Sequence, residues 1–229
     1  MQLKVFDFLN GSTNYWMSHG FKVVSRLEDA DILCLNGGTD IGTEIYGEEP
    51  VRDSRGWACS PKMKSWRDQR EIDQYNLAKA AGKFIFGICR GAQLVTCLEG
   101  GSLWQHVNNH HGDHPIKDLY TKEVYSATSV HHQMMRPNKD TPHQVIAYAD
   151  EADYKVSQHD EWRYSKNLTD TDHFDPEIVW YPEARALCVQ GHPEYATKGR
   201  FASYCTELIH HLWQNPVWPP EKVSAGIAG

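Results

Sequence analysis

The feature that most constrains this chain is a five-residue pattern, Gly87-Ile88-Cys89-Arg90-Gly91, at the end of an apolar run. The run, Phe84–Ile88, is short and apolar, which predicts a buried strand, and residues 90–98 are typical of a helix. A strand that turns sharply into a helix needs small residues two positions before and two after the turn. The pattern therefore predicts a nucleophile elbow that presents Cys89 at a helix N-terminus, where the dipole stabilises a thiolate. A buried cysteine in an ordinary turn is the alternative.

A cysteine nucleophile needs a base, and the base needs a group that orients it. Gln190-Gly191-His192-Pro193-Glu194 offers both at the end of another predicted strand, residues 186–190. His192 would exchange the proton, and Glu194 would hold the imidazole in the useful tautomer. A His-x-Glu pattern alone is weak, but with the elbow it predicts a catalytic triad of Cys89, His192 and Glu194.

A third element is the loop Asn36-Gly37-Gly38-Thr39-Asp40, which follows the predicted strand of residues 31–35. Two glycines allow the backbone to approach a ligand closely and to turn an N–H group toward it. The backbone N–H of Arg90 is expected to point to the same place and to hold an oxyanion. An ordinary turn after a strand is the alternative for the glycine pair.

The order of the remaining segments indicates an α/β fold, because short apolar runs alternate with helical stretches. Residues 3–8 and 21–24 are predicted strands, 61–81 and 198–214 are predicted helices, and 102–148 alternate as antiparallel strands do. Residues 150–175 are polar and acidic and are predicted to form a long surface insertion. We expect a single domain over residues 1–229.

Composition excludes several classes of protein. The formal net charge of −7 argues against a nucleic-acid partner, because such binding needs a basic face. No apolar run reaches the roughly 18 residues of a membrane span, and the polar start lacks a signal-peptide core. The six cysteines are widely spaced, which is not typical of a disulfide-stapled secreted fold. We therefore expect a cytoplasmic protein without membrane or nucleic-acid partners.

With these motifs in hand, the chain resembles the class I glutamine amidotransferases, and within them the γ-glutamyl-γ-aminobutyrate hydrolase family of C26 cysteine peptidases. The motifs that carry the resemblance occur in order along most of the chain: Gly37-Gly38-Thr39-Asp40, Tyr46-Gly47-Glu48-Glu49-Pro50, Arg67-Asp68, Gly87-Ile88-Cys89-Arg90-Gly91-Ala92-Gln93, Gly100-Gly101-Ser102-Leu103, Ser129-Val130-His131-His132-Gln133 and Gln190-Gly191-His192-Pro193-Glu194. The chain departs from the family pattern at Gly191, where a bulky aromatic residue is usual.

The resemblance implies a three-layer, mostly parallel, flavodoxin-like sheet with flanking helices and a nucleophile elbow. It implies that Cys89 is the nucleophile, His192 the acid and base, and Glu194 its orienter. Gly37 or Gly38 would form the oxyanion hole with Arg90. The resemblance further assigns Gln93 and His131 to substrate binding.

The implied reaction is hydrolysis of a γ-glutamyl amide through a thioester. Three hypotheses follow: a glutamine amidotransferase that supplies ammonia to a separate synthetase or ligase, a free-standing γ-glutamyl peptide or amine hydrolase, and a catalytically silent binding protein. The substrate would be glutamine or another γ-glutamyl amide, and we expect no cofactor. The histidine-rich stretch with His106, His110, His111, Asp113 and His114 fits no closed metal site by its spacing, so we expect no metal.

Overall fold

A nine-stranded sheet runs through the centre of the protein, as seen in a computed structural model that describes residues 2–53, 55–152, 154–159, 161–163 and 175–217. Its strands in chain order are β1 (Lys4–Phe8), β2 (Lys22–Val24), β3 (Ile32–Leu35), β4 (Phe84–Ile88), β7 (His114–Asp118), β8 (Val124–Ala127), β10 (Gln144–Ala149), β13 (Asp175–Tyr181) and β14 (Ala186–Val189). Their spatial order is β2-β1-β3-β4-β14-β13-β10-β7-β8.

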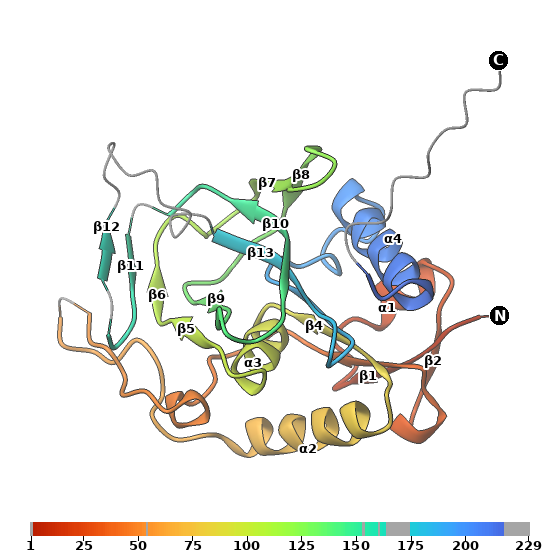
Figure 1. Cartoon of the computed structure of the whole chain (residues 1–229), viewed down its shortest axis with the longest axis horizontal. Coiled ribbons are helices and arrows are strands. Elements are labelled where there is room, and N and C mark those ends of the chain that lie inside the picture. Colours follow the sequence, from red (N-terminus) through yellow and green to blue (C-terminus); the bar gives the residue numbers. More distant parts are fainter. Residues whose placement is uncertain (1, 54, 153, 160, 164–174, 218–229) are drawn as a thin grey trace.

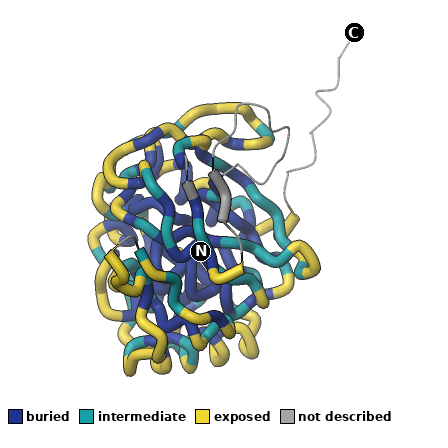
Figure 2. Tube along the Cα trace, turned by 90° about the vertical axis from the view of Figure 1, so that its left-hand side faces the viewer, coloured by how far each residue is buried: buried dark blue, intermediate teal, exposed yellow. Residues whose placement is uncertain are grey.

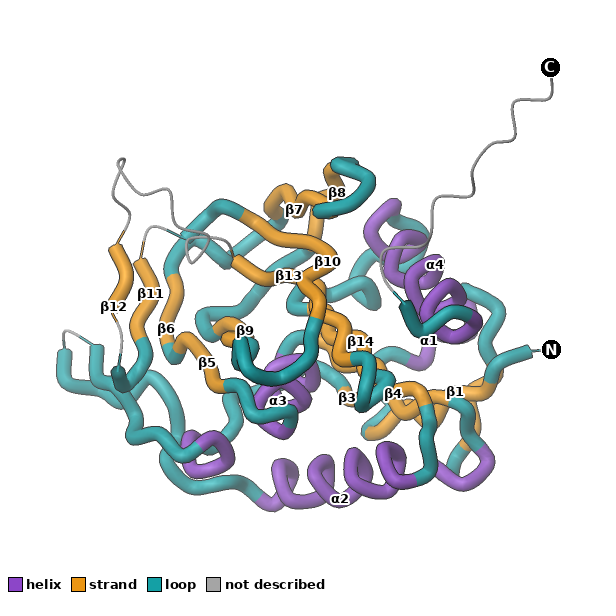
Figure 3. The backbone as a smooth tube through the Cα atoms, in the orientation of Figure 1, coloured by secondary structure: helices purple, strands orange, loops and turns teal. Residues whose placement is uncertain are grey.

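The sheet has a parallel part and an antiparallel extension. Neighbouring strands from β2 to β14 pair in parallel, and β13, β10, β7 and β8 continue the sheet in antiparallel fashion. Two small sheets lie beside the extension (Figure 3). One pairs β5 (Ser102–Trp104) with β9 (Met134–Arg136), and the other joins β6 (His106–Val107), β11 (Tyr154–Val156) and β12 (Glu161–Arg163).

The helices cover both faces of the parallel strands. They are α1 (Thr13–Ser18), α2 (Trp66–Ala80), α3 (Arg90–Leu98) and α4 (Arg200–Gln214), with short 3-10 turns η1 (Leu27–Asp29) and η2 (Thr43–Tyr46). Side chains of α1 and α4 share one apolar cluster with Phe84 and Phe86, whereas α2 and α3 share another with Leu33 and Ile85. Because successive strand residues point to opposite faces, the sheet separates two cores. In Figure 2 the buried segments lie in the middle of the protein, with exposed segments around them. The predicted three-layer α/β class is confirmed.

Two predicted elements differ from the structure. The helix predicted over residues 61–81 begins at Trp66, because Ser65 and Asp68 form a reciprocal capping box that starts the helix there. The segment before the helix contacts η2 instead. The carbonyl oxygens of Pro61 and Lys62 accept hydrogen bonds from the backbone N–H groups of Thr43 and Glu44.

The predicted insertion, residues 150–175, is not all loop, since it contains β11 and β12, which pair with each other, and β11 also pairs with β6. Its residues 164–174 lie outside the described residues, as does the tail after residue 217. Among the helices that the structure describes, none combines the length and apolarity needed to cross a membrane.

Candidate active site

Four loops meet at one edge of the sheet, where β1, β3, β4 and β14 end. These strands belong to the parallel part, so their carboxyl ends lie on the same side, the usual place for a site in an α/β sheet. The loop after β4 carries Cys89, the loop after β14 carries His192 and Glu194, and the loop after β3 carries Gly37. The topology therefore brings together residues that are up to 157 positions apart in the sequence.

The turn from β4 to α3 is strained at Cys89, whose backbone has φ 48° and ψ −107°. Non-glycine residues rarely adopt a positive φ. The tightness of the turn explains Gly87, where a Cβ would lie 2.8 Å from the backbone of Ala92. A Cβ on Gly91 would instead collide with the carbonyl of Leu35 on β3. Cys89 thus sits directly before the first turn of α3, whose N–H groups, that of Arg90 included, lack partners within the helix.

His192 lies between a carboxylate and the thiol. Its Nδ1 is 2.7 Å from Oε1 of Glu194, and the exposed ring of Tyr195 stacks on the imidazole at a centroid distance of 4.3 Å. Burial lowers the pKa of His192, but the Cys89 and Glu194 side chains outweigh burial and raise this pKa to about 10. The imidazole is therefore protonated at neutral pH and can donate a proton.

The glycine loop after β3 packs directly on this pair. A Cβ on Gly37 would lie 2.7 Å from Cε1 of His192 and 3.6 Å from Cβ of Cys89. Only a residue without a side chain allows the backbone to come this close. Gly38 instead faces the guanidinium of Arg67, which a Cβ there would strike. Of the two glycines, Gly37 is the one beside the candidate nucleophile.

A buried charge network links the glycine loop to the elbow. Arg67 on α2 donates to the carbonyl oxygen of Gly37 at 2.9 Å and to the carboxylate of Glu71 at 2.9 Å. Glu71 and Asp68 in turn both accept from the guanidinium of Arg90. Burial and the neighbouring Arg67 lower the pKa of Arg90 to about 10, so this guanidinium keeps its charge at neutral pH.

No pattern in the sequence assigns a role to this network. The spacing of Arg67 and Glu71, four positions apart on a helix, signals an ion pair. That spacing does not reveal that Arg67 also binds the glycine loop after β3. Tyr195 was likewise missed, and nothing in the sequence marks it as a partner of His192.

The two residues that the resemblance assigns to substrate binding both form hydrogen bonds with other residues of the protein. Gln93 is buried on α3, where its Nε2 donates to the carbonyl oxygen of Gln133 at 3.0 Å. His131 donates from Nδ1 to the same carbonyl oxygen at 2.8 Å, and burial and His110 lower the pKa of His131 well below its usual range. The ring of His131 lies against that of His110, with centroids 4.8 Å apart.

Gly191, the departure from the family pattern, does not open space beside His192. A Cβ at this position would lie 3.1 Å from the ring of Phe201 and 3.2 Å from Cβ of Ala127. Phe201 on α4 is buried and fills the room that a side chain at position 191 would need. A cavity of about 580 Å³ lies nearby, where His192 and Pro193 form part of its wall with Tyr125 and Arg200.

Known proteins resemble this chain in sequence and in fold. The family model described as Peptidase C26 matches residues 18–160. Protein NtpR of Enterococcus hirae is 27% identical over 186 residues, which cover 65% of this chain and 74% of that protein. The carbamoyl phosphate synthase small chain of Helicobacter acinonychis is 28% identical over 150 residues, covering 64% of this chain and 34% of that one.

Among solved structures, a glutamine amidotransferase from Thermotoga maritima superposes with a TM-score of 0.53. The alignment covers 94% of this chain and 87% of that one at 10% identity, so the likeness concerns the fold.

Proposed function

The chain belongs to the Peptidase C26 family, and we propose that it is a cysteine-dependent hydrolase of γ-glutamyl amides. The observation that carries the proposal is the meeting of the strained Cys89 turn, the His192–Glu194 pair and the Gly37 backbone at one sheet edge. These are the three parts that acyl transfer requires: a nucleophile, an oriented acid and base, and backbone donors for an oxyanion.

The reaction follows from the positions of these groups. The Cys89 sulfur attacks the side-chain carbonyl carbon of the γ-glutamyl group, and the negative oxygen that forms is held by the N–H groups of Gly37 and Arg90. His192 gives its proton to the amide nitrogen, the C–N bond breaks, and a γ-glutamyl thioester remains. Water then gives a proton to His192 and attacks the thioester, which releases glutamate and returns Cys89 and His192 to their starting protonation states.

The leaving group defines two forms of this function. If it is ammonia, the protein is a glutaminase that supplies a separate synthetase or ligase, as the similarity to a carbamoyl phosphate synthase small chain favours. If it is a larger amine, the protein is a γ-glutamyl peptidase.

Glutamate release from glutamine and from a γ-glutamyl dipeptide tests the proposal. We expect Cys89→Ser to lower release by more than about 10³-fold. Cys59→Ser is the matched control, because Cys59 is a partly exposed free thiol on the loop between η2 and α2. Faster turnover of the dipeptide would assign the peptidase, and slow turnover of glutamine that rises with a synthetase partner would assign the amidotransferase. Release that survives in Cys89→Ser, or that is absent in the wild type, contradicts the proposal.

A further inference from the structure

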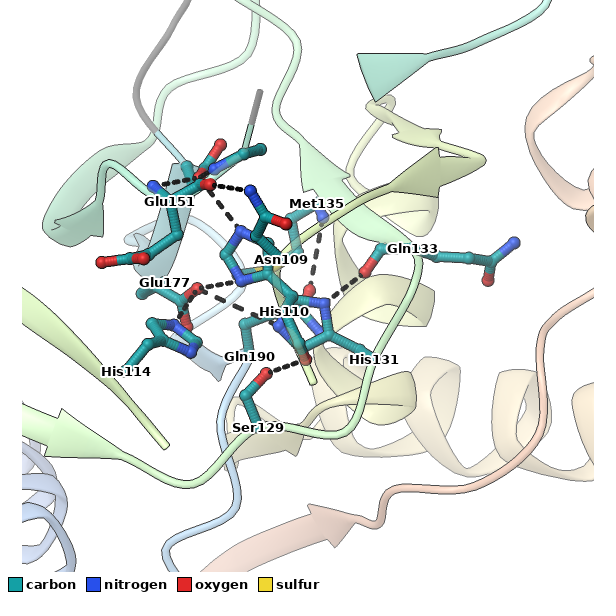
Figure 4. A network of polar contacts seen from close by, with 12 residues as sticks. Asn109, His110, His114, Ser129, His131, Gln133, Met135, Glu151, Glu177 and Gln190 are labelled. Atoms are coloured by element: carbon teal, nitrogen blue, oxygen red, sulfur yellow. Dashed lines mark hydrogen bonds and ion pairs between the residues drawn. The ribbon is translucent and has the colours of Figure 1, made fainter. Parts of the chain in front are cut away.

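Three potential metal ligands from distant parts of the chain meet in the antiparallel extension of the sheet (Figure 4). His110 precedes β7, His131 follows β8, and Glu177 lies on β13. One ligand atom from each lies within 4.8 Å of the others. All three side chains are at most 2% exposed, so water does not solvate them.

The hydrogen bonds of the two histidines leave one ring nitrogen of each directed at Glu177. His131 donates its Nδ1 proton to the carbonyl oxygen of Gln133, which leaves Nε2 as a lone-pair atom 4.0 Å from Glu177 Oε1. His110 donates from Nε2 to the carboxylate of Asp175 at 3.0 Å, and its Nδ1 lies 3.5 Å from Glu177 Oε1. A carbonyl or carboxylate behind each ring is the arrangement that orients metal-binding histidines.

Glu177 completes the set. Its Oε1 accepts a hydrogen bond from Nε2 of His114 at 3.1 Å, whereas Oε2 has no hydrogen-bond partner among the described residues. The facing atoms, Nδ1 of His110 and Nε2 of His131, also lack hydrogen-bond partners there. A buried carboxylate and two lone-pair nitrogens repel one another unless a cation lies between them.

We propose that His110, His131 and Glu177 bind one divalent transition-metal ion. Two imidazoles and one carboxylate are a ligand set that suits zinc. Ligands on one tetrahedral zinc, at about 2.0–2.2 Å from the ion, lie about 3.4 Å apart. The observed 3.5 and 4.0 Å separations from Glu177 are close to that value.

The bound ion has a structural role behind the candidate active site. The carbonyl oxygen of Glu177 accepts from the N–H of Gln190, and the N–H of His192 donates to the carbonyl oxygen of Thr128 at 2.9 Å. The ion would therefore hold together the strand and the loop on which the His192 segment rests. It would not contact the substrate, and no step of the proposed reaction passes through it.

The test measures zinc in the 229-residue Cys89→Ser protein, in which the Cys89 sulfur is absent and cannot bind metal. The protein is dialysed against a chelator, analysed by elemental mass spectrometry, and then titrated with Zn²⁺. We expect one equivalent of zinc per chain, either retained or regained, and a Tm that rises with Zn²⁺ but not with Mg²⁺, which avoids imidazole ligands. Less than half an equivalent in both measurements, or no zinc-specific rise in Tm, overturns the proposal.

Two variants in the same background locate the ion. Glu177→Gln keeps the acceptor for His114 but loses the carboxylate charge, so zinc affinity should fall at least about 100-fold. His111→Ala is the control, because His111 is exposed and lies outside the cluster. Loss of zinc in His111→Ala, or unchanged affinity in Glu177→Gln, contradicts the assignment. If Glu177→Gln does not fold, His131→Gln makes the same comparison.

Discussion

Arg67 donates a hydrogen bond from its guanidinium to the backbone carbonyl oxygen of Gly37, at 2.9 Å. This contact fixes the peptide of the glycine loop beside Cys89 and His192, and Glu71 holds Arg67 in place. The loop after β3 is thereby tied to α2. Arg67 is a positioning residue, since it reaches the loop and not the reacting atoms.

Arg67 also donates to the carbonyl oxygen of Asn36 at 3.1 Å, and the Asn36 peptide carries the N–H of Gly37. Arg67→Ala should therefore lower kcat for glutamate release about 100-fold with little change in KM, because the N–H of Gly37 would lose its fixed direction. Steady-state kinetics measure the changes in kcat and KM separately. Arg70→Ala is the control on the same helix, since Arg70 is exposed and contacts only the rings of Trp66 and Phe8 in described interactions. Equal losses in both variants would show that the effect comes from the helix and not from the loop contact.

Glu194→Gln should lower the pKa of His192, because Glu194 is one of the groups that raise this pKa to about 10 from an ordinary value of 6.5. A histidine whose pKa rises on folding stabilises the fold fully below pH 6.5, and this stabilisation is lost as the pH rises toward 10. The variant should therefore show a shallower fall in Tm between these limits. NMR titration of the His192 ring gives the pKa directly.

Glu123→Gln is the control for that titration, because Glu123 is an exposed carboxylate that pairs with Arg200. It should leave the pKa of His192 and the slope of Tm unchanged. An unaltered His192 pKa in Glu194→Gln would show that Glu194 does not act on the imidazole.

Cys89→Gly should be more stable than Cys89→Ala by about 1 kcal/mol, which reverses the usual order of these residues. The reason is the φ of 48° at this position, which glycine adopts readily and alanine does not. Both variants lack the thiol, so they differ only in the backbone strain and one methyl group. Urea denaturation measures the free energies of unfolding, and greater stability of the alanine variant would mean that the turn is not strained.

Gly91→Ala should lower the free energy of unfolding by about 3 kcal/mol, because the added methyl would collide with the carbonyl of Leu35 on the neighbouring strand. Gly20→Ala offers a comparison: no atom lies within 4 Å of its added Cβ, and only the φ of 82° is unfavourable. Gly20→Ala is expected to lower the free energy of unfolding by about 1 kcal/mol. Denaturation of both variants checks the difference, and equal costs would argue against close packing at the elbow.

Much of the parallel part of the fold could be predicted from local patterns. The strand before Cys89 was predicted with its observed bounds, Phe84–Ile88, and the strands ending at Phe8 and Leu35 begin within one residue of their predicted starts. Local chemistry suffices here, because apolar runs and turn residues are adjacent in the chain. The helix predicted from residue 61 failed for the opposite reason: Pro61 and Lys62 bind η2, a partner that periodicity does not reveal.

The sequence by itself determined the turn at the elbow, since a side chain on Gly87 would clash with the backbone of Ala92, only five residues away. The need for glycine at position 91 is tertiary, because the clash there is with Leu35 on β3. The sequence also determined that His192 and Glu194 can pair, because only one residue separates them. Tertiary structure alone decided that Arg67 holds the Gly37 loop, and that His110, His131 and Glu177 face one another. Those contacts join residues 21 to 67 positions apart, and their distances depend on how the strands are ordered in the sheet.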